Sequence, residues 1–180
     1  MKYLKNYFLF LEKNAIYEFG CVMVKLNFTN WNDLENRIDK SDLFEPENEH
    51  YGFETEPHLT LLYGLHEEVT ENDVRDVLKN FTLEDLEIKI DGIGNFQNQD
   101  FDVLKFNVVK NSLLENINKA LEKLPNSNRY PEYNPHITIA YLKKGTSIKY
   151  LDDNFKTTIS DIEDIIYSKP NGEKISIKFG

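Results

Sequence analysis

Hydrophobic residues along the chain change repeatedly between the two-residue period of a strand and the three-to-four-residue period of a helix. In the first half, period-two stretches predict strands over 21–28, 58–65 and 86–93. Helical stripes follow the first two strands, with apolar positions at Trp31, Leu34 and Ile38, then Val74, Val77, Leu78 and Phe81. Thr70, with Asp73 three residues later, favours a capped start for the second helix. Residues 92–100 predict a turn.

The second half repeats this order of elements. Its predicted strands and closing hairpin lie at 101–109, 136–142, 157–168 and 173–179. A helix capped by Ser112 follows the first of these strands, and a polar loop over 125–135 precedes the next. The hairpin turns at Pro170-Asn171-Gly172. Such a repeat predicts a tandem α+β duplication.

The N-terminal segment lies outside this repeat. Its apolar residues recur at helical spacing, which predicts an amphipathic helix within residues 1–19. The apolar run from Tyr7 to Leu11 stops at Glu12, so it is too short for a membrane span and poor as a signal-peptide core. The sequence thus predicts a soluble protein that is not processed.

A second segment outside the repeat is the acidic stretch 39–57. It holds seven acidic residues together with Pro46, Gly52 and Pro57, which predicts a long surface loop of the kind that forms a lid or is disordered. We expect one domain over 1–180. Its parts are the N-terminal helix 1–19, lobe one 20–96 and lobe two 97–180.

Composition narrows the classes of function. Lys and Arg number 21 against 31 Asp and Glu, which gives a net charge of −10. This sign opposes the binding of long nucleic acid or an anionic membrane, so any phosphate must be bound by local groups. The single cysteine, Cys21, excludes a disulfide framework and a Cys-rich zinc site and favours the reducing cytoplasm.

One pattern occurs once in each half of the chain: Pro-His-aliphatic-Thr-aliphatic-x-Tyr, at 57–63 and 135–141. Each copy follows a long loop and lies on a predicted strand. Side chains two positions apart on a strand share a face. By this parity, Tyr63 and Tyr141 are expected on the face opposite to that of the motif histidines.

The side chains that share the motif face are His58 and Thr60 in the first copy and His136 and Thr138 in the second. If the two halves pack about a pseudo-twofold axis, the two pairs face one cleft. A neutral imidazole could then remove a proton from an attacking oxygen, and an imidazolium could protonate the leaving oxygen. The threonine hydroxyls could donate hydrogen bonds to the phosphate. This arrangement favours cleavage of a phosphodiester without a metal.

The two motifs make the chain resemble the 2H phosphoesterase superfamily, whose members carry two His-x-Thr/Ser motifs in a duplicated fold. The resemblance extends from about Cys21 to the end of the chain. It implies an α+β fold of two pseudo-twofold-related lobes of antiparallel sheet, with helices outside and a central cleft. It also implies no metal or other cofactor. The residues that match the family's catalytic and phosphate-binding positions are His58, His136, Thr60 and Thr138.

A narrower likeness is to the bacteriophage anti-CBASS nucleases, which degrade the cyclic di- and trinucleotide signals of bacterial antiviral defence. It rests on residues 19–23, the helix led by Trp31, and residues 51–65. It implies that a neighbouring 2'-OH attacks a 3',5' linkage and leaves a 2',3'-cyclic phosphate. The protein would then act in the cytoplasm of the host bacterium. The base-stacking aromatic of that branch falls on Tyr17 or Phe19.

Further residues near the second motif are candidates for substrate binding. Lys143 could add positive charge beside the phosphate, and Tyr133, like Tyr130, could stack on a nucleobase. Solvated surface charge and simple packing are the alternative interpretations. His66 has no motif around it and is expected to be a surface residue.

Two other functions stay open at this stage. One is a 2',3'-cyclic phosphodiesterase or RNA-end-processing enzyme of the 2',5'-RNA ligase type. The other is a non-catalytic protein that sequesters cyclic nucleotides. In each case the expected partner is small, with no long nucleic acid and no membrane. An exposed edge of the closing hairpin could also pair with a second copy and form a homo-oligomer.

Overall fold

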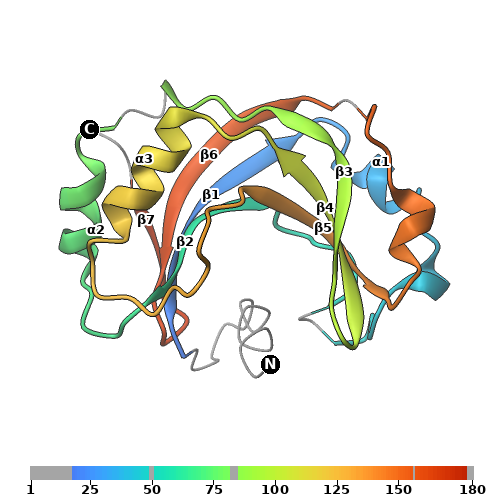
Figure 1. Ribbon diagram of the computed structural model, residues 1–180, viewed down its shortest axis with the longest axis horizontal. Coiled ribbons are helices and arrows are strands. Elements are labelled where there is room, and N and C mark those ends of the chain that lie inside the picture. Colours follow the sequence, from blue (N-terminus) through green and yellow to red (C-terminus); the bar gives the residue numbers. More distant parts are fainter. Residues whose placement is uncertain (1–17, 49–50, 82–84, 156, 178–180) are drawn as a thin grey trace.

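The computed structural model describes residues 18–48, 51–81, 85–155 and 157–177. They form one arched antiparallel sheet of seven strands (Figure 1). The strands are β1 (Gly20–Phe28), β2 (His58–Leu65), β3 (Ile90–Gln97), β4 (Phe101–Val108), β5 (His136–Lys143), β6 (Ile159–Ser168) and β7 (Lys174–Ile177). Their order across the sheet is β3-β4-β5-β2-β1-β6-β7. The predicted α+β class with an antiparallel sheet is confirmed.

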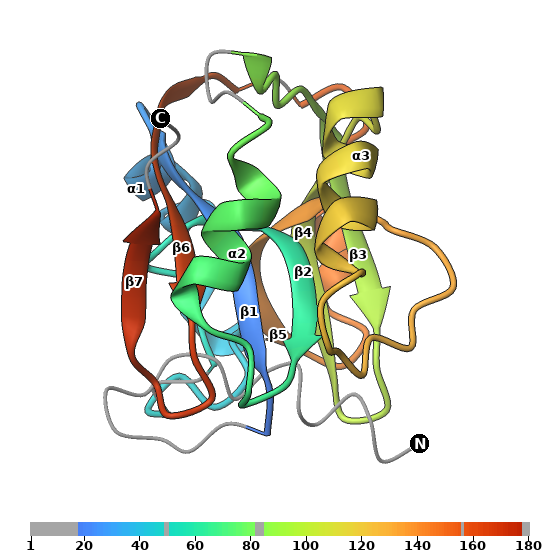
Figure 2. The ribbon, with the colours of Figure 1, turned by 90° about the vertical axis from the view of Figure 1, so that its left-hand side faces the viewer.

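Helices cover the outer, convex side of the arch. They are α1 (Trp31–Glu35), α2 (Glu71–Leu78) and α3 (Ser112–Leu121), with short 3-10 turns η2 (Lys40–Asp42) and η4 (Ser147–Tyr150). Helices α2 and α3 lie side by side at one end of the arch, and α1 lies at the other end (Figures 1 and 2). Their apolar residues join one face of the sheet in a single core. The other, concave face is therefore the one available for a site.

Several local predictions are confirmed and others need correction. Thr70 and Asp73 form the expected capping box. Asn111 rather than Ser112 caps α3, because its side chain accepts the Leu114 N–H. The predicted turn 92–100 is wrong, since β3 continues to Gln97. Residues 18 and 19 form a bend, and the rest of the predicted N-terminal helix lies outside the described residues.

The two sides of the sheet do not correspond to the two halves of the chain. Strand β3 pairs with β4 at one edge, and β6 pairs with β1 near the other. Each side of the sheet therefore takes strands from both segments, 20–96 and 97–180. The division of the chain into lobes at that position stays a prediction.

The centre of the sheet is the seam between β2 and β5, where Leu59 pairs with Ile137. Beyond this point the two strands separate, and each continues pairing with a loop that precedes the other motif. The Ser127 N–H donates to the Gly64 carbonyl at 2.8 Å, and the Tyr141 N–H donates to the Gly52 carbonyl at 2.7 Å. The two halves of the sheet are thus interlocked through exchanged loops.

This exchange corrects the prediction for the acidic stretch 39–57, whose described residues form neither a lid nor a disordered loop. They run along β5, with Leu43 bridged to Leu142 and Phe53 bridged to Ala140. Glycine is required where the other loop meets β2. Gly64 has φ +106°, and a Cβ there would lie 2.8 Å from the Asn128 backbone nitrogen.

A β-bulge interrupts each motif strand directly after the motif threonine. Leu61 is the extra residue in β2, and Ile139 is the extra residue in β5. A bulge places two residues opposite one and so reverses the facing of every later side chain. Tyr63 consequently lines the concave face, and Tyr141 packs with Phe101 on that face. The prediction that these tyrosines face the other side is wrong.

Candidate functional site

The two His-x-Thr motifs meet at the seam of the sheet. Because Leu59 is paired with Ile137 in an antiparallel register, the adjacent positions are also opposite one another. The resulting cross-strand neighbours are His58 with Thr138 and Thr60 with His136. Directly opposite residues have Cβ atoms about 4.5–5.5 Å apart. The four side chains thus form one compact group on the concave face.

Both histidine rings are held by the same backbone contact. Nδ1 of His58 lies 2.8 Å from the Glu56 carbonyl oxygen, and Nδ1 of His136 lies 2.8 Å from the Asn134 carbonyl oxygen. A carbonyl can only accept, so Nδ1 of each ring carries a proton that it donates. In the neutral ring the lone pair is then on Nε2, which is the nitrogen that can exchange a proton with a substrate.

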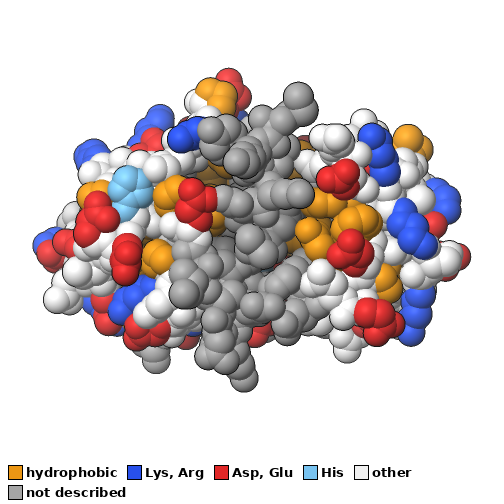
Figure 3. Space-filling model, turned by 90° about the horizontal axis from the view of Figure 1, so that it is seen from below, with side chains coloured by type: hydrophobic (Ala, Val, Ile, Leu, Met, Phe, Trp, Pro, Cys, Tyr) orange, Lys and Arg blue, Asp and Glu red, His pale blue; other side chains and the backbone are white. Residues whose placement is uncertain are grey.

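A cavity of about 810 Å³ opens beside this group. The volume lies within the roughly 300–1,000 Å³ that is typical of small-molecule sites. Much of its polar lining consists of amide and phenol side chains: Asn118, Asn128, Asn134, Tyr63, Tyr130 and Tyr133. Seen from below, hydrophobic side chains gather toward the middle of this face, with acidic side chains among them (Figure 3). The cavity suits flat, polar heterocycles better than a long polyanion.

The predicted substrate-binding residues fall in different places. Tyr133 lines the cavity, and its hydroxyl donates to the Thr60 carbonyl at 3.0 Å. Phe19 contacts the cavity residue Tyr63 edge-on, with ring centroids 6.1 Å apart. Lys143 lies at the far end of β5, where its Nζ donates to the Ser41 carbonyl at 2.6 Å. Tyr17 lies outside the described residues. The structure therefore brings Tyr133 to the motif group and places Lys143 away from it.

A cation that the sequence analysis missed, Lys105, lies next to the motifs. It is on β4, directly opposite Thr138, and is only 8% exposed. Its Nζ donates to the Asn107 side-chain oxygen and sits 4.5 Å from the centroid of the Phe96 ring. In the sequence, Lys105 occurs within a mostly apolar strand, at an alternating position that it shares with Phe101 and Val103. A lysine at such a position is a detectable signal of a special role. The residues around Lys105, however, are set by strand pairing, which the sequence alone does not show.

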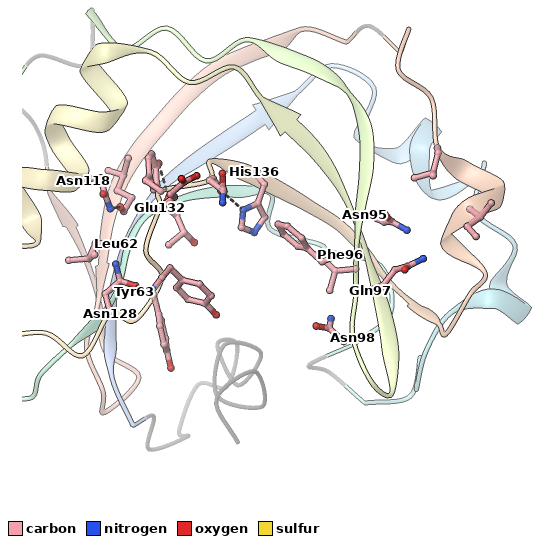
Figure 4. A pocket seen from close by; sticks show the side chains of 18 residues that line it. Leu62, Tyr63, Asn95, Phe96, Gln97, Asn98, Asn118, Asn128, Glu132 and His136 are labelled. Atoms are coloured by element: carbon pink, nitrogen blue, oxygen red, sulfur yellow. Dashed lines mark hydrogen bonds between the residues drawn. The ribbon is translucent and has the colours of Figure 1, made fainter. Parts of the chain in front are cut away.

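Phe96 links this lysine to the second histidine. Its ring meets the His136 ring edge-on, with centroids 4.9 Å apart. Figure 4 shows Phe96 and His136 turned toward one another, whereas Asn95 and Gln97 point to the other side of β3. Phe96 is 38% exposed, so a large apolar ring is presented to the cavity beside the imidazole. Such a ring offers a surface on which a nucleobase can stack.

The charges around the two histidines differ. The pKa of His136 is lowered to about 4, mainly by burial and in part by the neighbouring charges of Lys105 and His58, against the raising effect of the Asn134 carbonyl. His136 therefore resists protonation in the free protein. His58 instead lies near the carboxylate of Glu56. The pKa of Glu56 is lowered, first by its hydrogen bond to Lys174 and in part by its electrostatic interaction with His58.

Two other kinds of site are not found among the described residues. Within 18–177, gaps excepted, no group of three or more His, Cys, Asp or Glu side chains is arranged to hold a metal ion. The described helices include none that is both long and apolar enough to cross a membrane.

Comparison with known proteins agrees with this geometry. Residues 31–163 match the family described as the 2'-5' RNA ligase superfamily. The fold is similar to that of Usb1 from Kluyveromyces marxianus, with a TM-score of 0.54 and 11% identity over 90% of this chain and 98% of that one. A second Usb1 structure, with uridine monophosphate, gives a TM-score of 0.53 and 11% identity over 90% and 99% of the two chains. No curated protein sequence matches the chain.

Proposed function

The chain belongs to the 2'-5' RNA ligase superfamily of 2H phosphoesterases, and we propose that within it the protein is a metal-independent phosphodiesterase that cleaves 3',5'-linked cyclic di- or trinucleotides. One observation carries the proposal. His58 and His136 lie on facing strands, and the same Nδ1 contact to a backbone carbonyl leaves Nε2 of each ring as the proton-exchanging atom. Two such imidazoles can serve as the base and the acid for a single phosphate.

The proposed reaction needs only groups present in the site and in the substrate. One imidazole removes the proton of the ribose 2'-OH, and the 2'-oxygen forms a bond to phosphorus. The bond from phosphorus to the 5'-oxygen breaks, and the other imidazole gives that oxygen a proton. The products are a 2',3'-cyclic phosphate and a 5'-hydroxyl. Thr60 and Thr138 donate hydrogen bonds to the non-bridging oxygens, whose charge increases as the new bond forms.

The cavity supports a small substrate. The lining residues include no Lys or Arg within the described part of the chain, and Glu132 is one of them. The whole protein has a net charge of −10, which opposes a long polyanion. The amide and phenol side chains can form hydrogen bonds with base edges and stack on base faces. A ring of two or three nucleotides brings several bases and few phosphates.

The biological role that we propose is removal of cyclic nucleotide signals of bacterial antiviral defence. The likeness to the anti-CBASS nucleases rests on residues 19–23, the helix led by Trp31 and residues 51–65, which include the start of β1 and all of β2. The likeness therefore falls on one of the two strands that meet at the seam. A second candidate, RNA-end processing, is favoured by the family itself and by the fold shared with Usb1.

One experiment separates these candidates. The protein is incubated in EDTA with cyclic dinucleotides, cyclic trinucleotides and RNA ending in a 2',3'-cyclic phosphate, and the products are identified by mass. We expect the cyclic nucleotides to be opened, with a 2',3'-cyclic phosphate product formed first. The 2'-deoxy form of the same ring is the control and should stay intact.

The alternative outcomes contradict the proposal in distinguishable ways. Turnover of the RNA end alone would assign the protein to RNA processing. Tight binding with full recovery of intact cyclic nucleotide would make it a sequestering protein. Cleavage of the 2'-deoxy ring would exclude attack by the neighbouring hydroxyl.

A further inference from the structure

Outside the motifs, the most informative feature of the site is a difference between two equivalent positions. The strand flanking each motif strand places one buried side chain opposite the motif threonine. On β1 it is Met23, opposite Thr60, and on β4 it is Lys105, opposite Thr138. Met23 is 5% exposed and Lys105 is 8% exposed. Directly opposite residues share a face of the sheet, so both side chains border the motif group.

The ammonium of Lys105 is held in place without being neutralised. Its contacts are the Asn107 side-chain oxygen and the face of Phe96, neither of which carries a negative charge. The salt bridges found among the described residues do not involve Lys105. Gly94, its partner on β3, has no side chain that could cover it. An ammonium has three N–H donors, so Lys105 retains the capacity to bind an anion beside Thr138.

We infer that Lys105 binds the non-bridging oxygens of the substrate phosphate beside Thr138 and sets the direction of the reaction, so that His136 accepts the proton of the attacking hydroxyl and His58 protonates the leaving oxygen. The inference rests on the proposed phosphodiesterase function and deepens it. It assigns different roles to two histidines that the duplicated motifs leave interchangeable.

The direction follows from the charges that face each ring. His136 is faced by Lys105 from β4, by His58 from β2 and by the uncharged Phe96 from β3. Burial first, and then the positive charge of Lys105, disfavours the imidazolium, so His136 starts neutral and can accept a proton. Among the described residues that line the cavity, the one carboxylate is that of Glu132, which lies 3.9 Å from the Lys110 ammonium.

His58 is surrounded by a different set of charges. They are the Glu56 carboxylate, paired with Lys174 at 2.8 Å, and Lys25, directly opposite on β1. Because His136 takes the accepting role, the donating role falls to His58. In the step itself, the 2'-OH proton moves to Nε2 of His136 as the 2'-oxygen binds phosphorus. The 5'-oxygen leaves with the proton from Nε2 of His58. Proton exchange with water then restores both rings.

The test is Lys105→Met, which puts into the second half the residue that the first half has at the equivalent position. Without the ammonium, the phosphate loses a charge-assisted hydrogen bond, and kcat/KM should fall about 10- to 100-fold. The acid limb of the kcat/KM profile should move to higher pH, because His136 is then more easily protonated. Lys105→Arg should restore much of the activity.

The matched control is Lys143→Met. Lys143 lies at the far end of β5, away from the motif group, and its Nζ donates to the Ser41 carbonyl at 2.6 Å. We expect little change in kcat/KM or in the pH profile. If Lys143→Met and Lys105→Met have the same effect, a general loss of positive charge explains both, and the inference is overturned.

Two measurements on the free protein keep the inference independent of turnover. NMR titration should show the His136 ring resonances moving at higher pH in Lys105→Met than in the parent, and the affinity for inorganic phosphate should fall. If cyclic nucleotides are not cleaved, the proposed function fails, but these measurements still test Lys105. An unchanged His136 titration together with unchanged phosphate affinity would refute its role. Lys105→Gln, which keeps a polar contact to Asn107, provides the same readouts if the methionine variant does not fold.

Discussion

The strand carrying His58 and the strand carrying His136 have the same backbone construction but different surroundings. Both strands hold the imidazole through Nδ1 and a carbonyl two residues earlier, and both bulge just after the motif threonine. The differences are in the flanking side chains. The second ring meets Phe96 and an ammonium, whereas the first lies beside a carboxylate. A duplicated backbone can thus support an acid and a base that are not equivalent.

Removing either imidazole should have the largest effect. We expect His58→Ala and His136→Ala each to reduce kcat by roughly 10²- to 10⁴-fold, because positioned proton transfer contributes about that much per group. KM should change far less. His66→Gln is the matched control, since His66 contacts Ser127 outside the motif group.

The two variants should also differ in their pH dependence, which sharpens the comparison. Loss of the base should remove the acid limb of the kcat/KM profile in His136→Ala. Loss of the acid should remove the alkaline limb in His58→Ala. The reverse assignment of the two limbs would contradict the direction inferred from Lys105. Unchanged turnover in either variant would refute the proposal that the two histidines act as a catalytic pair.

A second expected effect concerns stability against pH. The folded-state pKa of His136 is about 4, below the value of about 6.5 for an unperturbed histidine. Between these values the unfolded chain binds more protons, so the contribution to stability is present above pH 6.5 and is lost as the pH falls toward 4. The loss should amount to up to about 3 kcal/mol.

Chemical unfolding at a series of pH values measures this effect. In His136→Gln the free energy of unfolding should depend less steeply on pH between about 4 and 6.5 than in the parent. The carboxylates of the chain contribute equally to the pH dependence of both proteins, so the difference between the two curves isolates the contribution of the His136 ring. Parallel curves would show that His136 does not stay neutral in the folded protein.

The smallest effect that we predict concerns the bulges. The Leu61 carbonyl, at the first bulge, accepts from the buried Asn118 side chain at 2.7 Å. The Ile139 carbonyl, at the second bulge, accepts from the Glu54 backbone N–H at 2.8 Å. Only the first bulge therefore depends on a side chain. Asn118→Leu leaves a buried carbonyl without its donor and should cost about 1–3 kcal/mol of unfolding free energy.

The control for this prediction is Asn126→Leu, which removes a half-buried amide that donates to the nearby Glu122 and Leu124 carbonyls. Its cost should be clearly smaller. Since Leu61 directly follows Thr60, we also expect Asn118→Leu to reduce kcat/KM. Equal stability of the two variants would mean that the first bulge is maintained by the sheet alone.

The sequence allowed the site to be predicted more completely than the fold around it. Strict alternation placed His58 with Thr60, and His136 with Thr138, on one face, and this required only the local geometry of a strand. The facing of Tyr63 could not be predicted, because a bulge depends on the pairing partner. The same holds for Lys105, whose importance comes from its register with Thr138.

Fold-level errors have a similar cause. The stretch 39–57 is acidic and contains breakers, which are typical of an exposed loop. Its conformation depends on β5. Beyond the seam, the edge of β5 that faces away from β4 has no partner strand and forms hydrogen bonds with this loop instead. The continuation of β3 through Gly92 and Gly94 is likewise a consequence of long-range pairing with β4.

The exchanged loops have a consequence for how this protein can be altered. The loop before each histidine completes the edge of the strand that carries the other histidine. If the two halves were separated by a break in the polypeptide between the motifs, each would expose unpaired backbone groups at a strand edge. Association of the two pieces would pair these groups again. A mutation that disrupts either loop should therefore disturb the motif strand on the other side of the seam. The conformation of each motif strand thus depends on the opposite half of the molecule.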